Sequence, residues 1–277
     1  MKPIVDVIWF MGQSNMQGQT ERLTEDNAPI ENAFEYRYFT DNLIPLKNPV
    51  GEFILKDLSK GWDVPKNVVA DQIREWQIAH ALGGSVSGNT NLVPKFCKHY
   101  TEITGKKVVA VHTAKGATVV KEWLPDDVVF KVAWKKMQKA VECVKRTYTI
   151  DKIYIAWLQG ESDAIAGTCK ETYMQQMIEL KNNAKADFGV EKFGIIKVGR
   201  FTTTGRDQAI FDAQETLPLI DSDFLMLSRI TEDLIDDPAY MNPYARGHYN
   251  SDGQEKIGTH AGTNLALMTL GKEPIYK

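Results

Sequence analysis

The stretch Val7–Gln19, VIWFMGQSNMQGQ, joins an apolar run of strand length to a turn flanked by Gly12 and Gly18. The run from 4 to 11 is almost continuously apolar, which is typical of a strand buried on both faces. Comparable runs, each bounded by Gly, polar or charged residues, recur at 108–112, 153–158, 193–198 and 224–227. The sequence therefore predicts five buried strands.

Segments with helical spacing separate several of these runs. The clearest place apolar residues three to five positions apart at 129–144 and again at 257–268. Buried strands that alternate with amphipathic helices favour a mostly parallel sheet covered on both faces. The predicted fold is a three-layer α/β/α sandwich with five strands.

The segment from about 20 to 67 does not follow this alternation, because it carries four prolines, scattered aromatic residues and no sustained period. Long excursions of this kind are usually functional or disordered, and the aromatic residues favour a packed lid or substrate wall. The chain shows no internal repeat and no convincing linker. We predict a single domain over residues 1–277, and the sequence gives no indication of its oligomeric state.

Composition limits the classes of function. The chain has 277 residues, 43% of them hydrophobic and 25% charged, with a formal net charge of −3, as in soluble globular proteins. No run of like charges points to nucleic acid or an anionic membrane, so we expect a small-molecule partner. Three widely spaced cysteines indicate neither a zinc site nor a disulfide framework. Without a recognisable signal peptide or a long apolar run, a cytoplasmic location is expected.

Ser14 and His248 are the candidate reactive residues. Ser14 follows the first predicted strand, and ligands of open parallel sheets bind beyond the carboxyl ends of the strands. By itself, a serine after a strand is more often a helix cap than a nucleophile. His248 lies in a loop just before the last predicted helix, whereas the other histidines lie inside predicted elements and fit structural roles. A histidine at that edge could act as a base toward Ser14.

Three separated blocks support this interpretation. They are Gly12-Gln13-Ser14-Asn15-Met16, then Ala114-Lys115-Gly116-Ala117-Thr118 with Glu122-Trp123, and then Trp157-Leu158-Gln159-Gly160-Glu161-Ser162-Asp163. Together with Gly247-His248-Tyr249, they resemble the SGNH (GDSL-like) hydrolases over essentially the whole chain. Within that superfamily the sequence is similar to carbohydrate esterases of the acetylxylan esterase and sialate O-acetylesterase type. The resemblance implies a flavodoxin-like SGNH fold and a serine esterase that removes O-acetyl groups from a carbohydrate without a metal or organic cofactor.

The resemblance also implies a site. Ser14 would be the nucleophile and His248 the base, while the Ser14 and Gly116 backbone amides and the Gln159 side chain would hold the oxyanion. Many relatives place Asp three residues before the histidine, and here that position is Ala245. A substitute acid is therefore expected: Glu161 first, then Asp163, then Asp237.

Substrate recognition is predicted for Gln13, Trp123, Arg200 and Arg246, with Tyr249 as a further candidate. The two arginines could bind an acidic sugar such as a sialic or uronic acid, or could pair with carboxylates of the protein. The missing Asp also leaves open a carbohydrate-binding protein with impaired catalysis. A nucleotide site at the glycine-rich stretch 83–88 is a weak third hypothesis, because no P-loop lysine follows it.

Overall fold

A computed structural model describes residues 2–51 and 89–276 of the protein. Its centre is a seven-stranded sheet with the order β3-β2-β4-β1-β5-β6-β7, in which only the β2–β3 pair is antiparallel. The strands are β1 (Ile4–Gly12), β2 (Ala33–Arg37), β3 (Asn42–Pro45), β4 (Lys107–Ala114), β5 (Thr149–Leu158), β6 (Lys192–Ile196) and β7 (Phe224–Ser228). The mostly parallel sheet predicted from the sequence is confirmed, and the five predicted strands are β1 and β4 to β7.

The two additional strands, β2 and β3, come from the segment that the sequence predicts to be an excursion. Their apolar pattern is interrupted because β2 carries Glu35 and Arg37, both buried. Arg37 Nη2 lies 2.9 Å from Glu35 Oε2, and Glu35 Oε1 accepts a hydrogen bond of 2.7 Å from the Gly51 N–H. Because the two charged side chains are paired and hydrogen-bonded, both can be buried near the edge of the sheet. The remainder of the excursion, 52–67, lies outside the described residues.

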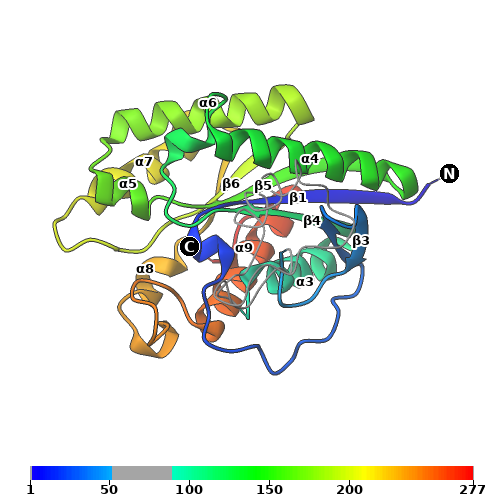
Figure 1. Ribbon diagram of the computed structural model, residues 1–277, viewed down its shortest axis with the longest axis horizontal. Coiled ribbons are helices and arrows are strands. Elements are labelled where there is room, and N and C mark those ends of the chain that lie inside the picture. The colour runs from blue at the N-terminus through cyan, green and yellow to red at the C-terminus, as the bar shows by residue number, and fades with distance from the viewer. Residues whose placement is uncertain (1, 52–88, 277) are drawn as a thin grey trace, which may run out of the picture.

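Helices cover both faces of the sheet, which confirms the three-layer architecture (Figure 1). Helices α4 (Val128–Thr147) and α6 (Lys170–Phe188) lie on one face, while α3 (Leu92–Thr104) and α9 (Ser251–Thr269) lie on the other. The other helical elements are α1 (Ser14–Gln17), η2 (Val120–Trp123), α5 (Glu161–Ala166), α7 (Asp207–Ile220), α8 (Ile230–Leu234) and η3 (Pro238–Tyr240). None of the helices in the described ranges is both long and apolar enough to cross a lipid bilayer.

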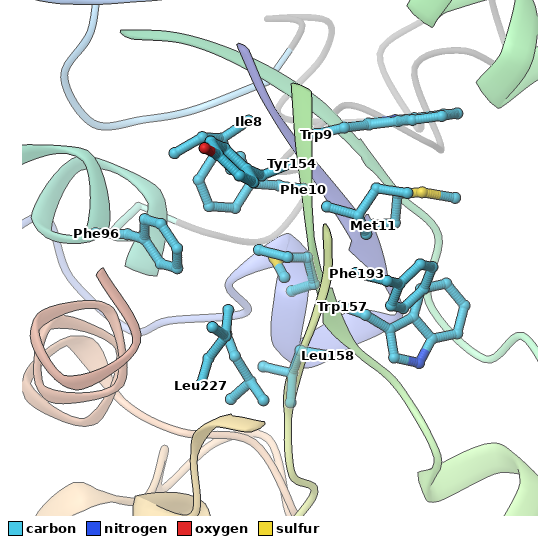
Figure 2. Packing of buried hydrophobic residues seen from close by; sticks show 14 of the residues in the cluster. Ile8, Trp9, Phe10, Met11, Phe96, Tyr154, Trp157, Leu158, Phe193 and Leu227 are labelled. Atoms are coloured by element: carbon cyan, nitrogen blue, oxygen red, sulfur yellow. The ribbon is translucent and has the colours of Figure 1, made fainter. Parts of the chain in front are cut away.

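Strand β1 forms the middle of the core. Every residue of β1 after Ile4 is buried, because the strand lies between β4 and β5 and under helices on both sides. Figure 2 shows Trp9 and Met11 on one side of this strand and Ile8 and Phe10 on the other. Burial of each such side chain contributes roughly 1.5–3 kcal/mol, so β1 is a rigid base for the residues that follow it.

Close packing of α9 against α3 fixes the element that follows the candidate base. A Cβ atom at Gly258 would lie 2.3 Å from the carbonyl oxygen of Leu92, and one at Gly262 would lie 2.2 Å from that of Phe96. Only glycine allows the two helices to approach this closely. The start of α9 is thereby held near the sheet, together with the loop that precedes it.

Candidate active site

Ser14 begins helix α1 immediately beyond the carboxyl end of β1. The turn into α1 requires glycine at position 12, where φ is +146° and a Cβ would lie only 2.1 Å from the carbonyl oxygen of Leu158. The Gln13 N–H donates to that same carbonyl at 3.0 Å, and the Lys115 N–H donates to the Gly12 carbonyl at 2.8 Å. The loops that follow β1, β4 and β5 therefore meet at one edge of the sheet.

His248 reaches Ser14 from the loop between η3 and α9. Its Nε2 atom lies 2.8 Å from Ser14 Oγ, although the two residues are 234 positions apart. The loop is closed on itself, since the Asn242 N–H donates to the His248 carbonyl at 2.8 Å and Met241 forms a β-bridge with Tyr249. The structure thus brings together the serine and the histidine that the sequence predicts to react together.

Backbone carbonyls set the tautomer of His248. Its Nδ1 atom lies 3.0 Å from the carbonyl oxygen of Arg246 and 3.3 Å from that of Ala245. A carbonyl oxygen can only accept, so Nδ1 carries the ring proton and Nε2 presents its lone pair to Ser14. The imidazole is oriented as a base for the Ser14 hydroxyl.

Glu161, the first candidate acid, does not pair with His248. Its Oε1 atom instead accepts a hydrogen bond of 2.8 Å from Asn15 Nδ2. Glu161 is the first residue of α5, and the hydrogen bond links its carboxylate to α1. The expected Glu161–His248 pair is therefore corrected: the groups at Nδ1 are carbonyl oxygens of the histidine's own loop.

The other two candidate acids have structural partners. Asp163 accepts hydrogen bonds from the Val120 N–H at 2.8 Å, from Thr168 Oγ1 at 2.8 Å and from Gln159 Nε2 at 2.6 Å. Asp237 caps η3 by accepting from the Ala239 N–H at 2.9 Å. Both carboxylates hold local backbone in place, which is the ordinary role of acidic residues at the start of helical turns.

Burial changes the acidity of two groups at this edge. Desolvation lowers the pKa of His248, and the hydrogen bonds to the Arg246 and Ala245 carbonyls only partly oppose this effect. Desolvation also raises the pKa of Glu161, against the lowering effect of its bond with Asn15. At neutral pH His248 is therefore uncharged, as a base must be before it accepts a proton.

Two of the three predicted oxyanion donors, the N–H groups of Ser14 and Gly116, belong to neighbouring residues, since a Cβ at Gly116 would lie 3.5 Å from Ser14 Cβ. Ser14 is the first residue of α1, so its own N–H has no acceptor within the helix. The Gly116 N–H donates to Gln17 Oε1 at 2.8 Å. The Gln17 side-chain oxygen thus occupies the Gly116 N–H, one of the donors that the oxygen of a bound ester would need. The sequence analysis missed Gln17, although a spacing of three from Ser14 on a helical turn places it on the same face.

The third predicted donor, Gln159, is used elsewhere. Its Nε2 group donates to the Thr118 carbonyl at 2.8 Å and to Asp163 Oδ2 at 2.6 Å, and its side chain is fully buried. Both N–H groups are therefore occupied, and neither is presented to Ser14. Gln159 instead connects the loop after β4 with the start of α5, which corrects the role that the resemblance implies.

A cleft of about 430 Å³ opens above Ser14 and His248. Its lining includes Gln13, whose Oε1 atom accepts from the Ser162 N–H at 3.1 Å. The other lining residues are Gln17, Gln19, Lys115, Gly116, Ala117, Ser162, Ile165 and Phe201. The space above the serine is large enough for a small ester and offers it both polar and apolar contacts.

A larger cleft of about 1270 Å³ adjoins the first, and the two share Ile165 and Phe201. Three guanidinium groups line it, those of Arg200, Arg206 and Arg246, against the single carboxylate of Asp236. Arg200 forms a close ion pair with Asp236, as the alternative reading of the sequence expected. Within the described ranges, no ion pair involves Arg206 or Arg246, so this cleft carries net positive charge.

Two aromatic candidates for substrate binding belong to the core. Trp123 is fully buried, donates to Thr118 Oγ1 at 3.1 Å and packs edge-on against Trp157. Tyr249 is also buried, and its hydroxyl donates to the Thr231 carbonyl at 3.1 Å. Neither residue lines either of the two clefts. Both rings contribute to core packing instead.

Among residues 2–51 and 89–276, no three His, Cys, Asp or Glu side chains are grouped so as to hold a metal ion. The glycine-rich stretch 83–88 lies outside the described residues.

Comparison with known protein families places the chain in one of them. A sequence profile of the carbohydrate esterase, sialic acid-specific acetylesterase family matches residues 5–264, so the chain belongs to that family. No curated protein matches the sequence significantly.

Two solved structures share the fold at low sequence identity. A protein from Arabidopsis thaliana aligns with a TM-score of 0.61 and 16% identity over 96% of this chain and 98% of that one. A carbohydrate acetylesterase from Xanthomonas citri aligns with a TM-score of 0.56 and 13% identity over 98% of this chain and 58% of that one. At such identities the likeness establishes the fold alone.

The lowered pKa of His248 predicts the pH dependence of ester hydrolysis. Only the neutral imidazole can accept the Ser14 proton, so kcat/KM for p-nitrophenyl acetate should rise about tenfold per pH unit in acid and then level off. Because burial lowers the pKa of His248, the inflection should lie below the ordinary histidine value of 6.5. An inflection at or above 6.5 in the pH profile would contradict the assignment.

Proposed function

We propose that this chain is a serine esterase that removes O-acetyl groups from a carbohydrate through an acyl-enzyme. The observation that carries the proposal is the 2.8 Å contact between Ser14 Oγ and His248 Nε2, with the proton of His248 held on Nδ1. Membership of a carbohydrate esterase family supports the same reaction class. The cleft above the two side chains provides the space for the ester.

Acylation begins when the Ser14 hydroxyl attacks the acetyl carbonyl and gives its proton to His248 Nε2. The tetrahedral intermediate carries a negative charge on the former carbonyl oxygen. His248 then donates the proton to the departing sugar oxygen, the C–O bond breaks, and an acetyl group stays on Ser14. Water, deprotonated by the same imidazole, attacks the acetyl-serine and releases acetate, which restores the Ser14 hydroxyl.

The charged oxygen needs donors, and each one typically accelerates the reaction by about 10²–10³. The N–H groups of Ser14 and Gly116 serve this purpose in the proposed mechanism. For the second of them, the ester oxygen must take the place of Gln17 Oε1 on Gly116. The exchange replaces one acceptor with another, so no buried donor is left unpaired.

The histidine lacks a carboxylate, which bears on the rate. In serine proteases, loss of the acid's orienting function costs about 10⁴ because the wrong tautomer forms. Here the carbonyls of Arg246 and Ala245 select the correct tautomer, so that part of the function is kept. The stabilising negative charge beside the imidazolium is missing. A carbohydrate-binding protein with impaired catalysis remains the alternative proposal.

The proposed substrate class is an acetylated sugar with an anionic group. Arg246 and Arg206 line the larger cleft without an ion pair among the described residues, and this cleft continues directly from the one above Ser14. A guanidinium group binds a carboxylate through two parallel hydrogen bonds. A sialic or uronic acid ester would place its carboxylate there and its acetyl group at Ser14.

Replacement of either reactive side chain tests the proposed function. We expect Ser14→Ala and His248→Ala each to lower kcat/KM for an acetylated sugar by at least about a thousandfold, since the nucleophile and its base act as a unit. The exposed Ser222→Ala is the control and should retain full activity. Circular dichroism should show that all variants are folded. Unchanged turnover by Ser14→Ala would refute the proposal, and binding of the sugar without turnover by the unaltered protein would favour the alternative.

A charge-selective effect is expected from Arg246→Gln. Loss of one charged hydrogen bond, about 1.5–3 kcal/mol, should raise KM for an O-acetylated sialic or uronic acid by about tenfold or more. The KM for a neutral acetylated xyloside should change little. Arg146→Gln, on the exposed side of α4, is the matched control. Equal effects on the two sugars would show that the cleft does not recognise the anionic group.

A further inference from the structure

Asn15 lies between the serine turn and the loop of the histidine, and its side chain is almost completely buried. Its Nδ2 group donates to Glu161 Oε1 at 2.8 Å and to the Gly247 carbonyl at 3.2 Å. Its Oδ1 atom accepts from the Tyr249 N–H at 3.3 Å. One amide group therefore contacts the backbone on both sides of His248.

The orientation of the Asn15 amide is fixed because one of its backbone partners can only accept a hydrogen bond and the other can only donate one. The Gly247 carbonyl can only accept, and the Tyr249 N–H can only donate. Rotation of the Asn15 amide by half a turn would therefore place donor against donor and acceptor against acceptor. Glu161 Oε1 reinforces the same orientation by accepting from Nδ2.

We propose that Asn15 is a positioning residue that holds the His248 loop at the correct distance from Ser14, and that Glu161 acts through Asn15. This inference rests on the proposed esterase function. Ser14 and Asn15 are consecutive residues of α1, so the same helical turn carries the nucleophile and the side chain that holds its base. A displacement of about 1 Å between reacting groups can cost about a hundredfold in rate.

The hydrogen bonds at His248 Nδ1 do not provide this connection. The carbonyls at Nδ1, from Ala245 and Arg246, belong to the histidine's own loop and move with it. The turn of α1 is itself anchored, because Gln254 Nε2 donates to the Asn15 carbonyl at 2.9 Å and Asn91 Nδ2 donates to the Met16 carbonyl at 2.7 Å. Asn15 thus connects the loop that carries His248 to the anchored turn that carries Ser14.

Glu161 contributes an acceptor oxygen rather than a charge at the imidazole. Its Oε2 atom is buried and has no hydrogen-bond partner among the described residues. A half-satisfied buried carboxyl group is costly and is retained where it has a function. Its function here is the bond from Oε1 to Asn15, and a neutral acceptor of the same shape could replace it.

The first experiment compares Asn15→Ala with Asn264→Ala. Asn264 is the matched control because it is equally buried and holds backbone in the same way, through the Leu227 and Tyr276 carbonyls and the Ile275 and Tyr276 N–H groups, remote from Ser14. We expect Asn15→Ala to lower kcat for p-nitrophenyl acetate by about tenfold to a hundredfold with little change in KM. Asn264→Ala should lower the melting temperature without this loss of kcat. Equal kcat in the two variants would overturn the proposal.

The second experiment separates positioning from acid catalysis. Glu161→Gln keeps an oxygen that accepts from Asn15, whereas Glu161→Ala removes it. If Glu161 acts through Asn15, the Glu161→Gln variant should keep most of the kcat that Glu161→Ala loses. The double variant with Glu161→Ala and Asn15→Ala should then have the same kcat as Asn15→Ala alone. If Gln loses as much as Ala, the carboxylate charge itself is required and the proposal is wrong.

A third measurement does not depend on turnover. Hydrogen exchange at residues 244–249 should accelerate in Asn15→Ala and stay unchanged in Asn264→Ala, because Asn15 is hydrogen-bonded to this loop and Asn264 is not. Absence of esterase activity in the unaltered protein would defeat the proposed function alone. Unchanged exchange in Asn15→Ala would defeat the positioning role alone.

Discussion

The hydrogen bond between Ser14 Oγ and His248 Nε2 joins the end of the first strand to the loop before the last helix. Each partner depends on a close approach that only glycine permits. Gly12 lets the chain turn into α1 against the end of β5, and Gly258 and Gly262 let α9 lie against α3. The buried β1 at the centre of the sheet gives the serine a fixed position, and the packed α9 limits where the preceding loop can lie. The geometry of the site therefore depends on packing throughout the sandwich, although the candidate reacting atoms belong to two side chains.

The base of this site is oriented by backbone dipoles. Two carbonyl oxygens place the ring proton on Nδ1, which is the task that a carboxylate performs in a Ser-His-Asp triad. Burial lowers the pKa of His248, so the imidazole is neutral and ready to accept a proton. Glu161, the first candidate acid of the sequence analysis, instead accepts a hydrogen bond from Asn15. An aspartate in a triad supplies both orientation and negative charge, whereas the two carbonyls at His248 Nδ1 supply orientation alone.

Much of the fold could be predicted from the sequence because five strands are continuous apolar runs. The strands β2 and β3 could not, since the buried pair Glu35–Arg37 resembles surface sequence until its partners are known. Ser14 and His248 were identifiable because each follows or precedes a recognisable element at the same sheet edge. The acid and one oxyanion donor were not, because sequence does not show which way a side chain at the start of α5 points. Glu161 faces Asn15, and Gln159 faces Asp163 and Thr118.

The most direct test of the central claim is the crystal structure of the protein after reaction with a phosphonate that mimics the tetrahedral intermediate of acetyl transfer. We predict phosphorus bonded to Ser14 Oγ, with the phosphoryl oxygen facing the N–H groups of Ser14 and Gly116 and the side chain of Gln17 displaced from Gly116. His248 Nε2 should remain beside the adduct, with its Nδ1 on the carbonyls of its own loop. An adduct on another residue, or no adduct at Ser14, would contradict the account.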